Sequence, residues 1–191
     1  MGTPDKHQLQ RDRAALLVID IQGRLCTAMH PDRLRQVRKN TVRLIEGAKI
    51  LGLPIFVTEQ YPRGMGPTVP DIAAALPENQ KIYEKLHFSC CGVPEFMDAL
   101  QGSKRDQIIV AGMETHVCVF QTVRDLLVRN VVRSVFVVQD AVISRTEQNE
   151  RIGLSQMGEV GAVRTGTETV LFDLLQVAGT PEFKAISKLI K

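Results

Sequence analysis

The sequence contains no tryptophan, no CxxC or HExxH motif, and no apolar run long enough for a membrane helix. The missing cysteine and histidine spacings exclude a thioredoxin site and the common zinc sites. A bilayer span takes roughly 18 consecutive apolar residues, so we expect no membrane partner. The loop at 61–70 holds no GxGxxG and is followed by no GK[ST], so it is not a phosphate cradle. We therefore expect neither a metal nor a cofactor.

What remains is the composition of an ordinary globular protein. Of 191 residues, 44% are hydrophobic and 24% are charged, which excludes a disordered or fibrous chain. The length suits one domain, residues 1–191, and is short for two. The net charge of +3 is too small to require an acidic macromolecule, so we expect no nucleic-acid partner.

The cysteines are the unusual feature of the chain, at Cys26, Cys90, Cys91 and Cys118. Residues 1–13 are polar and lack the apolar stretch of a secretory signal. Lys6 stands where a myristoylation motif has Ser or Thr. We therefore expect a cytoplasmic, unlipidated protein whose cysteines are free thiols.

Short apolar runs alternate with amphipathic stretches along the chain. Strands are predicted over 14–19, 53–60, 107–112 and 134–140, with weaker ones over 81–85 and 158–165. Helices are predicted over 31–51, 93–100, 115–128, 146–156, 168–177 and 181–190. Apolar runs without alternation are typical of parallel strands that are covered on both faces. The pattern predicts an α/β fold, in which ligands bind beyond the carboxyl ends of the strands.

Three side chains that are candidates for catalysis follow predicted strands. Asp20 ends the first strand, where a carboxylate is as readily the cap of the next helix. Lys85 ends another, where a lone lysine is usually solvated. Cys118 lies in the first turn of a helix that Thr115 is predicted to cap, and a helix N-terminus lowers the pKa of a thiol. Taken alone, such a cysteine is usually a small buried hydrophobe.

Taken together, the three residues indicate a nucleophilic site. A cysteine nucleophile needs a base to accept its proton and a nearby cation to favour the thiolate. Asp20 and Lys85 supply these groups to Cys118 from strand ends at one edge of a parallel sheet. The free N–H groups of a helix's first turn can also receive a developing oxyanion.

The motifs that carry these residues resemble the isochorismatase-like cysteine hydrolase superfamily. They are LLVIDIQ with Asp20, EKLHFS with Lys85 and GMETHVCV with Cys118, and DAVISR is similar as well. The loop TEQYPRGMGPTVPDI and the end PEFKAISKLIK resemble the isochorismatase-domain-containing branch, which is related to nicotinamidases and N-carbamoylsarcosine amidase. The resemblance covers almost the whole chain. It implies a three-layer α/β/α sandwich with a mainly parallel, six-stranded, Rossmann-like sheet.

The resemblance also implies a mechanism. The family's Asp–Lys–Cys triad matches Asp20, Lys85 and Cys118, and a cis peptide is expected between Met113 and Glu114. The backbone N–H groups of Glu114 and Cys118 would form the oxyanion hole. Asp20 would take the thiol proton, the thiolate would attack a carbonyl, and water would clear the thioester after the amine leaves.

Two departures from relatives in this superfamily bear on the substrate. Nicotinamidases place a metal-binding Asp/His cluster where this chain has Glu59, Gln60 and Tyr61, which favours a metal-free site. Isochorismatases proper cleave a vinyl ether with the Asp as acid and without a thiol, so the presence of Cys118 favours an amide or related C–N substrate. Vinyl ether hydrolysis stays open, as does a non-catalytic module that contacts RNA. The basic side chains for RNA would be Arg35, Arg38 and Arg43, on what is more simply a solvated helix face.

Other residues carry weaker expectations. Four side chains are expected to contact substrate: Leu25, Tyr61, Met65 and Phe88. Cys90 and Cys91 are expected to pack near Lys85, Cys26 to be buried, and His116 to point away from Cys118. The resemblance implies a homo-oligomer, a dimer or larger.

Overall fold

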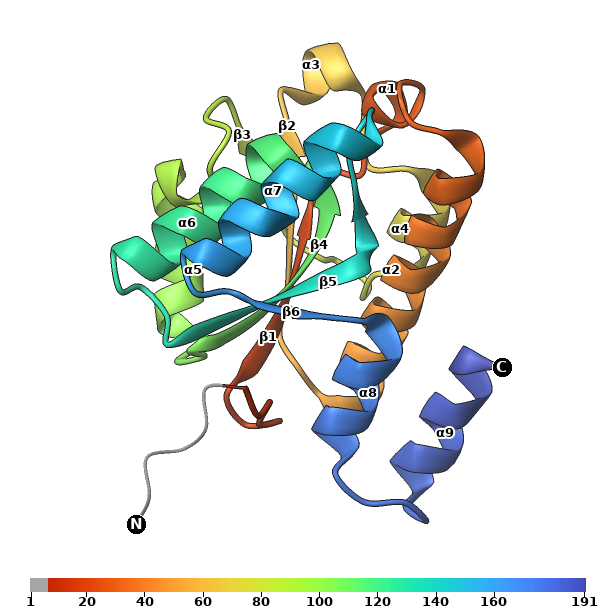
Figure 1. Cartoon of the computed structure of the whole chain (residues 1–191). Helices are drawn as coiled ribbons and strands as arrows, with labels where there is room; N and C mark the ends of the chain where they lie inside the picture. The colour runs from red at the N-terminus through yellow and green to blue at the C-terminus, as the bar shows by residue number, and fades with distance from the viewer. Residues whose placement is uncertain (1–6) are drawn as a thin grey trace.

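A six-stranded sheet forms the centre of the computed structural model, which describes residues 7–191 (Figure 1). The strands are β1 (Ala14–Ile19), β2 (Ile55–Gln60), β3 (Ile82–Lys85), β4 (Gln107–Met113), β5 (Ser134–Ile143) and β6 (Val163–Thr165). Their spatial order is β3-β2-β1-β4-β5-β6, and every neighbouring pair is parallel. Lys6, on which the expectation about lipidation depends, lies outside the described residues.

Helices cover both faces of the sheet (Figure 1). One layer holds α2 (Pro31–Leu51), α4 (Pro70–Ala75), α8 (Thr167–Leu175) and α9 (Pro181–Ile190), and the other holds α5 (Pro94–Gly102), α6 (Phe120–Val128) and α7 (Glu147–Glu159). The predicted three-layer α/β/α fold is therefore confirmed. Within residues 7–191, no helix has both the length and the apolar character to cross a bilayer.

The uninterrupted apolar run of β1 follows from its central position. Ala14, Leu16 and Val18 belong to the core under one helical layer, and the alternate residues Ala15, Leu17 and Ile19 belong to the core under the other. Because successive side chains of a strand point to opposite faces, both sets must be apolar when both faces are covered. Every residue of β1 is buried.

Several element boundaries differ from the prediction. β5 runs on to Ile143 rather than ending at Asp140, because Val142 and Ile143 still pair with the end of β4 after a shift in register. α7 runs on to Glu159, which leaves only Val163–Thr165 as β6. The loop at 61–70 includes the short helix α3 (Pro62–Met65), and another, α1 (Gly23–Cys26), follows β1. Pro62 at the first turn of α3 favours its start.

The chain order reverses between β1 and β4, which creates the crevice that open α/β sheets use for ligands. The two strands end in close contact there. A Cβ atom on Gly112 would lie 2.1 Å from the carbonyl oxygen of Ile19, and the φ of Gly112 is +130°. Only glycine permits this approach. The segments that carry Asp20 and Cys118 therefore leave the sheet side by side.

Candidate active site

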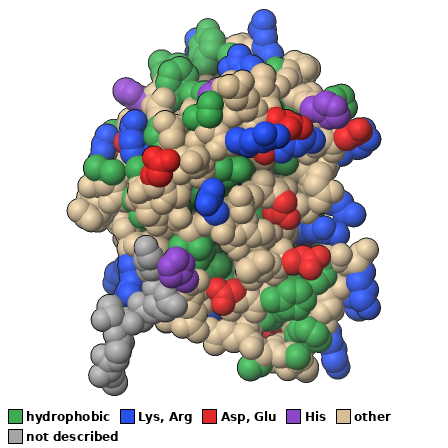
Figure 2. All heavy atoms as spheres, in the orientation of Figure 1, with side chains coloured by type: hydrophobic (Ala, Val, Ile, Leu, Met, Phe, Trp, Pro, Cys, Tyr) green, Lys and Arg blue, Asp and Glu red, His purple; other side chains and the backbone are tan. Residues whose placement is uncertain are grey.

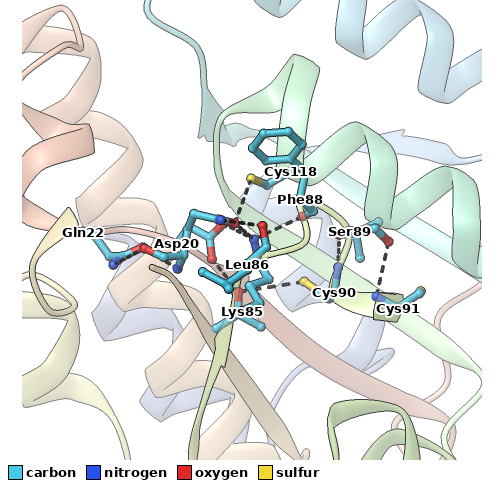
Figure 3. A network of polar contacts seen from close by, with 12 residues as sticks. Asp20, Gln22, Lys85, Leu86, Phe88, Ser89, Cys90, Cys91 and Cys118 are labelled. Carbon is cyan, nitrogen blue, oxygen red and sulfur yellow. Dashed lines mark hydrogen bonds and ion pairs between the residues drawn. The ribbon is translucent and has the colours of Figure 1, made fainter. Parts of the chain in front are cut away.

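The ends of three strands bring a carboxylate, an ammonium group and a thiol together. Asp20 directly follows β1, Lys85 ends β3, and Cys118 lies in the turn η2 (Thr115–Val119) after β4. Lys85 Nζ lies 2.6 Å from Asp20 Oδ2, and the Asp20 carboxylate lies near the Cys118 thiol. Figure 3 shows the three side chains converging on one point. The structure thus brings together the three residues that the sequence singled out.

Asp20 is held in an unusual backbone conformation. Its φ is +52°, in the left-handed region that Asp and Asn tolerate better than most residues. Thr58 Oγ1 donates a hydrogen bond to Oδ1 at 2.8 Å, and Lys85 occupies Oδ2. Burial raises the pKa of Asp20, although Lys85 opposes this rise. The site therefore contains a carboxyl group with a stronger affinity for protons than an exposed aspartate.

Lys85 is buried with a full set of hydrogen-bond acceptors. Its ammonium group donates to Asp20, to Gln60 Oε1 at 2.7 Å and to the carbonyl oxygen of Phe88 at 3.1 Å. An ammonium has three protons, so all of them are engaged. Burial lowers the pKa of Lys85, but the nearby Asp20 and the thiols outweigh burial and the pKa is raised. Lys85 is therefore a fixed positive charge at neutral pH.

Two predictions about Cys118 are wrong. Residues 115–119 form a single π-helical turn that begins after Glu114, so Thr115 is not the cap. Thr115 Oγ1 is buried and has no hydrogen-bond partner among residues 7–191. The pKa of Cys118 is raised rather than lowered, because the thiol is buried and faces the Asp20 carboxylate. In the resting protein Cys118 is thus a thiol, and a thiolate requires transfer of its proton.

The turn before Cys118 is fixed through Glu114. The Met113–Glu114 peptide bond is cis, and the Glu114 carbonyl accepts hydrogen bonds from the backbone of Val117 and Val119. The Glu114 carboxylate accepts a bond from the Arg145 backbone N–H at 2.9 Å and another from its Nη2 at 2.7 Å. The end of β5 therefore anchors the turn that carries the thiol. The oxyanion role of the Glu114 and Cys118 N–H groups stays a prediction.

A cavity of about 310 Å³ opens beside the Cys118 thiol. Its lining residues are Leu25, Gln60, Met65, Phe88, Glu114, Val117, Cys118 and Arg145. Three of the four predicted substrate contacts, at Leu25, Met65 and Phe88, are among them. Tyr61 instead lines a neighbouring hollow together with Lys85 and Leu86. The structure therefore places Tyr61 outside the cavity that contains the thiol.

This fold has counterparts in known proteins. Residues 14–169 match the isochorismatase domain family. The chain belongs to this family. The secreted isochorismatase effector Isc1 of Phytophthora sojae is 40% identical, over 83% of this chain and 76% of that protein. Isochorismatase domain-containing protein 2 of Bos taurus is 34% identical, over 92% of this chain and 82% of that protein.

Solved structures agree with the family assignment. The MAR1 ribonuclease of Caenorhabditis elegans superimposes with a TM-score of 0.89 at 38% identity, covering 96% of this chain and 92% of that one. The YcaC gene product of Escherichia coli, described as an octameric hydrolase of unknown specificity, gives a TM-score of 0.86 at 24% identity. It covers 98% of this chain and 92% of its own, and at that identity it supports the fold alone.

The residues where nicotinamidases bind metal serve other purposes in this isochorismatase-family chain. The Glu59 carboxylate accepts hydrogen bonds from the backbone N–H of Thr68 at 2.6 Å and from its hydroxyl at 2.7 Å. Gln60 faces Lys85. Over residues 7–191, no group of three or more His, Cys, Asp or Glu side chains is arranged to hold a metal ion.

The remaining cysteines are buried, and His116 contacts the segment after β5. Cys26, Cys90 and Cys91 are buried free thiols, and Cys90 Sγ lies 3.8 Å from Thr58 Oγ1. Burial raises the pKa of Cys90 to about 12. His116 Nδ1 lies 2.9 Å from Ser144 Oγ. These contacts place Cys90 in the wall of the site and attach the π-helical turn to the segment after β5.

Two residues that shape the candidate site, Gln60 and Arg145, were not predicted from the sequence. Gln60 ends β2, and its amide oxygen accepts from Lys85 and lies 4.0 Å from Cys118 Sγ. Arg145 follows β5 and binds Glu114. Both come at strand ends, so the rule that selected Asp20 and Lys85 could also have selected them. Their polar side chains lacked an obvious chemical role, which is why they were passed over.

The buried thiols predict a loss of stability at alkaline pH. An unfolded cysteine releases its proton near pH 9.0, whereas Cys90 retains its proton up to about pH 12 when folded. The folded state then binds more protons than the unfolded state, so the free energy of unfolding falls as pH rises above 9. Each such thiol contributes about 1.4 kcal/mol per pH unit. We expect Cys90→Ala to reduce this slope when denaturant unfolding is followed between pH 8 and 11.

Val137→Ala is the matched control, because it also truncates a fully buried side chain but removes no titratable group. It should lower the free energy of unfolding at every pH. The slope of this free energy against pH should stay the same as in the wild-type protein. Equal slopes for the Cys90→Ala and wild-type proteins would contradict the raised pKa.

Proposed function

We propose that this protein is a metal-independent cysteine hydrolase that acts on a small amide or related C–N substrate. The observation that carries the proposal is the position of the buried Asp20 carboxylate. It contacts the Lys85 ammonium group at 2.6 Å and lies near the Cys118 thiol. A base close to a thiol, next to a fixed cation, is the arrangement that covalent catalysis by cysteine requires.

In the proposed reaction Asp20 transfers protons, Cys118 carries the acyl group and Lys85 keeps its positive charge. Asp20 accepts the Cys118 proton, and the thiolate attacks the substrate carbonyl carbon to form a tetrahedral intermediate. Lys85 stabilises the thiolate by its charge. The amine leaves with the proton that Asp20 returns, and a thioester remains. Water, deprotonated by Asp20, then attacks the thioester and releases the acid and the thiol.

The raised pKa of Asp20 suits this exchange. A carboxyl group at its ordinary pKa would be too weak a base to take a proton from a thiol, and burial raises its proton affinity. The backbone N–H groups of Glu114 and Cys118 are proposed to receive the oxyanion. The cavity walls at Leu25, Met65 and Phe88 are proposed to contact the substrate body. Tyr61 retains at most a role at the edge of the site.

The proposal is tested by ammonia release from a panel of small amides and carbamoyl compounds. We expect one or more of them to be hydrolysed without added metal, and hydrolysis to persist in the presence of a chelator. Loss of all activity with the chelator would contradict a metal-independent site. A complete absence of turnover on a broad panel would count against the amide substrate class.

Vinyl ether hydrolysis is the second candidate, and the same raised pKa of Asp20 favours it. A raised pKa widens the pH range over which Asp20 carries the proton that a vinyl ether would accept. In that reaction Asp20 is needed and Cys118 is not. A comparison of Asp20→Asn with Cys118→Ala on an isochorismate-like substrate therefore separates the two mechanisms.

An RNA-contacting role is a third candidate, because one similar structure is named a ribonuclease. The basic residues predicted for it are largely engaged within the protein. Arg38 pairs with Asp71, Arg35 pairs with Asp32, and Arg43 donates to the carbonyl oxygen of Leu189 at 2.9 Å. Figure 2 shows basic side chains interspersed with acidic ones on the face in view. A salt-dependent affinity for RNA that is lost when the three arginines are neutralised would favour this role.

Assembly, location and domain structure are further proposals. We propose that residues 1–191 form one domain, that the protein is cytoplasmic, and that it forms a homo-oligomer. The octameric state described for YcaC, which has the same fold, supports assembly. So does the exposure of Leu86 at 74% and Phe88 at 52%, since apolar side chains of this size often mark an interface.

A further inference from the structure

Glu114 and Arg145 are the charged residues in the wall of the cavity beside Cys118. They form an ion pair in which Arg145 Nη2 lies 2.7 Å from Glu114 Oε1. Arg145 Nε donates to the other carboxylate oxygen at 3.1 Å, so the guanidinium and the carboxylate face each other along two bonds. Such a bidentate pair is among the stronger ionic contacts in proteins. Each of the two charges is therefore neutralised by the other.

The charges of Asp20 and Lys85 also neutralise each other. The side chains of Lys85 and Asp20 are completely buried and form a pair of their own. With one ammonium, one guanidinium and two carboxylates, the formal charge around the cavity is zero. Two further arginines lie outside this lining: Arg63 lines the neighbouring hollow, and Arg24 donates to the carbonyl oxygen of Gly64 at 3.3 Å.

The other lining side chains have little to offer a charged ligand. Leu25, Met65, Phe88 and Val117 are apolar, and Gln60 contributes a neutral amide. An anion that enters such a cavity gives up its hydration without gaining a free cation, which is costly. A neutral molecule with an apolar body loses far less on entry and buries its apolar surface against these walls.

We propose that the cavity selects an uncharged substrate, and that Glu114 determines this specificity by neutralising Arg145, the cation that would otherwise bind a carboxylate. This inference rests on the proposed function, because it takes the cavity beside Cys118 as the substrate site. It narrows the proposed substrate class to neutral amides with an apolar side. It also opposes an isochorismate-like acid as substrate, since Arg145 is already neutralised by Glu114.

The test compares two alkylating reagents of similar size, neutral iodoacetamide and anionic iodoacetate, at pH 8.5. The labelling rate of Cys118 is followed by mass spectrometry of its peptide. Each rate is divided by the rate of the same reagent with glutathione, which removes the intrinsic difference between them. In the wild-type protein we expect Cys118 to favour iodoacetamide by about tenfold over this reference.

Two variants show whether the ion pair causes the preference. Glu114→Gln removes one negative charge and leaves Arg145 unbalanced, so the preference for iodoacetamide should fall about tenfold. The double variant Glu114→Gln and Arg145→Gln restores a formal charge of zero and should regain the wild-type preference. Damage to the turn around Cys118 would not be repaired by a second substitution, so recovery in the double variant identifies charge as the cause.

Three outcomes overturn the inference: a wild-type preference equal to that of glutathione, an unchanged preference in Glu114→Gln, or no recovery in the double variant. Failure of both reagents to label Cys118 even after prolonged incubation also overturns it, because Asp20 can accept the thiol proton and a cavity open to small neutral molecules admits iodoacetamide. Failure of the proposed function has a different signature. In that case the labelling preferences follow the expected pattern while no neutral amide is hydrolysed.

Discussion

Cys118→Ala is expected to lower kcat/KM for the amide substrate by roughly 10⁴-fold or more, because it removes the atom that forms the thioester. No other thiol can replace it. Cys90, which lies nearest the triad, is fully buried and contacts Thr58 rather than the cavity. Binding should change little, so the loss should appear in kcat and not in KM. Steady-state hydrolysis by the purified variant measures both.

Cys26→Ala is the matched control for this experiment. It also deletes one buried thiol, but Cys26 lies in α1 and outside the network around Asp20. Its activity should stay within a few-fold of the wild-type protein. A Cys118→Ala protein that retains most of its activity while Asp20→Asn loses it would contradict covalent catalysis and favour catalysis by Asp20 without a thioester. A thioester trapped on the wild-type Cys118, identified by mass spectrometry, would support covalent catalysis directly.

The layers and the meeting of the three triad residues were predictable because they follow from strong local patterns. Uninterrupted apolar runs such as that of β1 require two covered faces, and a residue that follows a parallel strand must reach the same sheet edge as its counterparts. Asp20 and Lys85 were found by that rule. It needs no knowledge of side-chain contacts, only of where each strand ends.

The protonation state of Cys118 could not be predicted in the same way. Its place in the first turn of a helix suggested a lowered pKa, but the pKa depends on burial and on charges that arrive from distant parts of the chain. Asp20 lies about a hundred residues earlier in the sequence, and its carboxylate opposes the thiolate. The length of the turn was equally hidden, because a π-helical turn and an α-helical one share the same local residue preferences.

The Glu114–Arg145 pair was hidden for a related reason. Each residue had a local interpretation, Glu114 as a backbone donor and Arg145 as part of a familiar segment. Their contact depends on β4 and β5 being neighbours with a register that brings Met113 beside Ile143. Registers between parallel strands joined by a helix leave no short-range signal in a sequence. The feature that we propose to set substrate charge is therefore visible only in three dimensions.

Lys85→Met is expected to lower the free energy of unfolding by about 3–5 kcal/mol at pH 7, because it leaves the Asp20 carboxylate buried without its cation. Both side chains of the pair are fully buried, so water cannot replace the lost ammonium group. The loss should depend on pH. Without Lys85, burial raises the pKa of Asp20 further, so the folded state binds the extra proton and its stability falls as pH rises above the ordinary pKa of aspartate. Denaturant unfolding at pH 4.5 and pH 7 should show the smaller deficit at the lower pH.

Two further variants separate this electrostatic loss from the loss of packing. Lys81→Met removes a lysine of an exposed pair with Glu95, with side chains 59% and 73% exposed, and should change stability by no more than about 1 kcal/mol. Adding Asp20→Asn to Lys85→Met removes the orphaned charge and keeps a residue that tolerates the backbone conformation of position 20. The double variant should therefore regain most of the lost stability at pH 7 and lose the pH dependence. If it were no more stable than Lys85→Met alone, Lys85 would hold the fold through its contacts with Gln60 and Phe88, and the buried ion pair would have no stabilising part in the site.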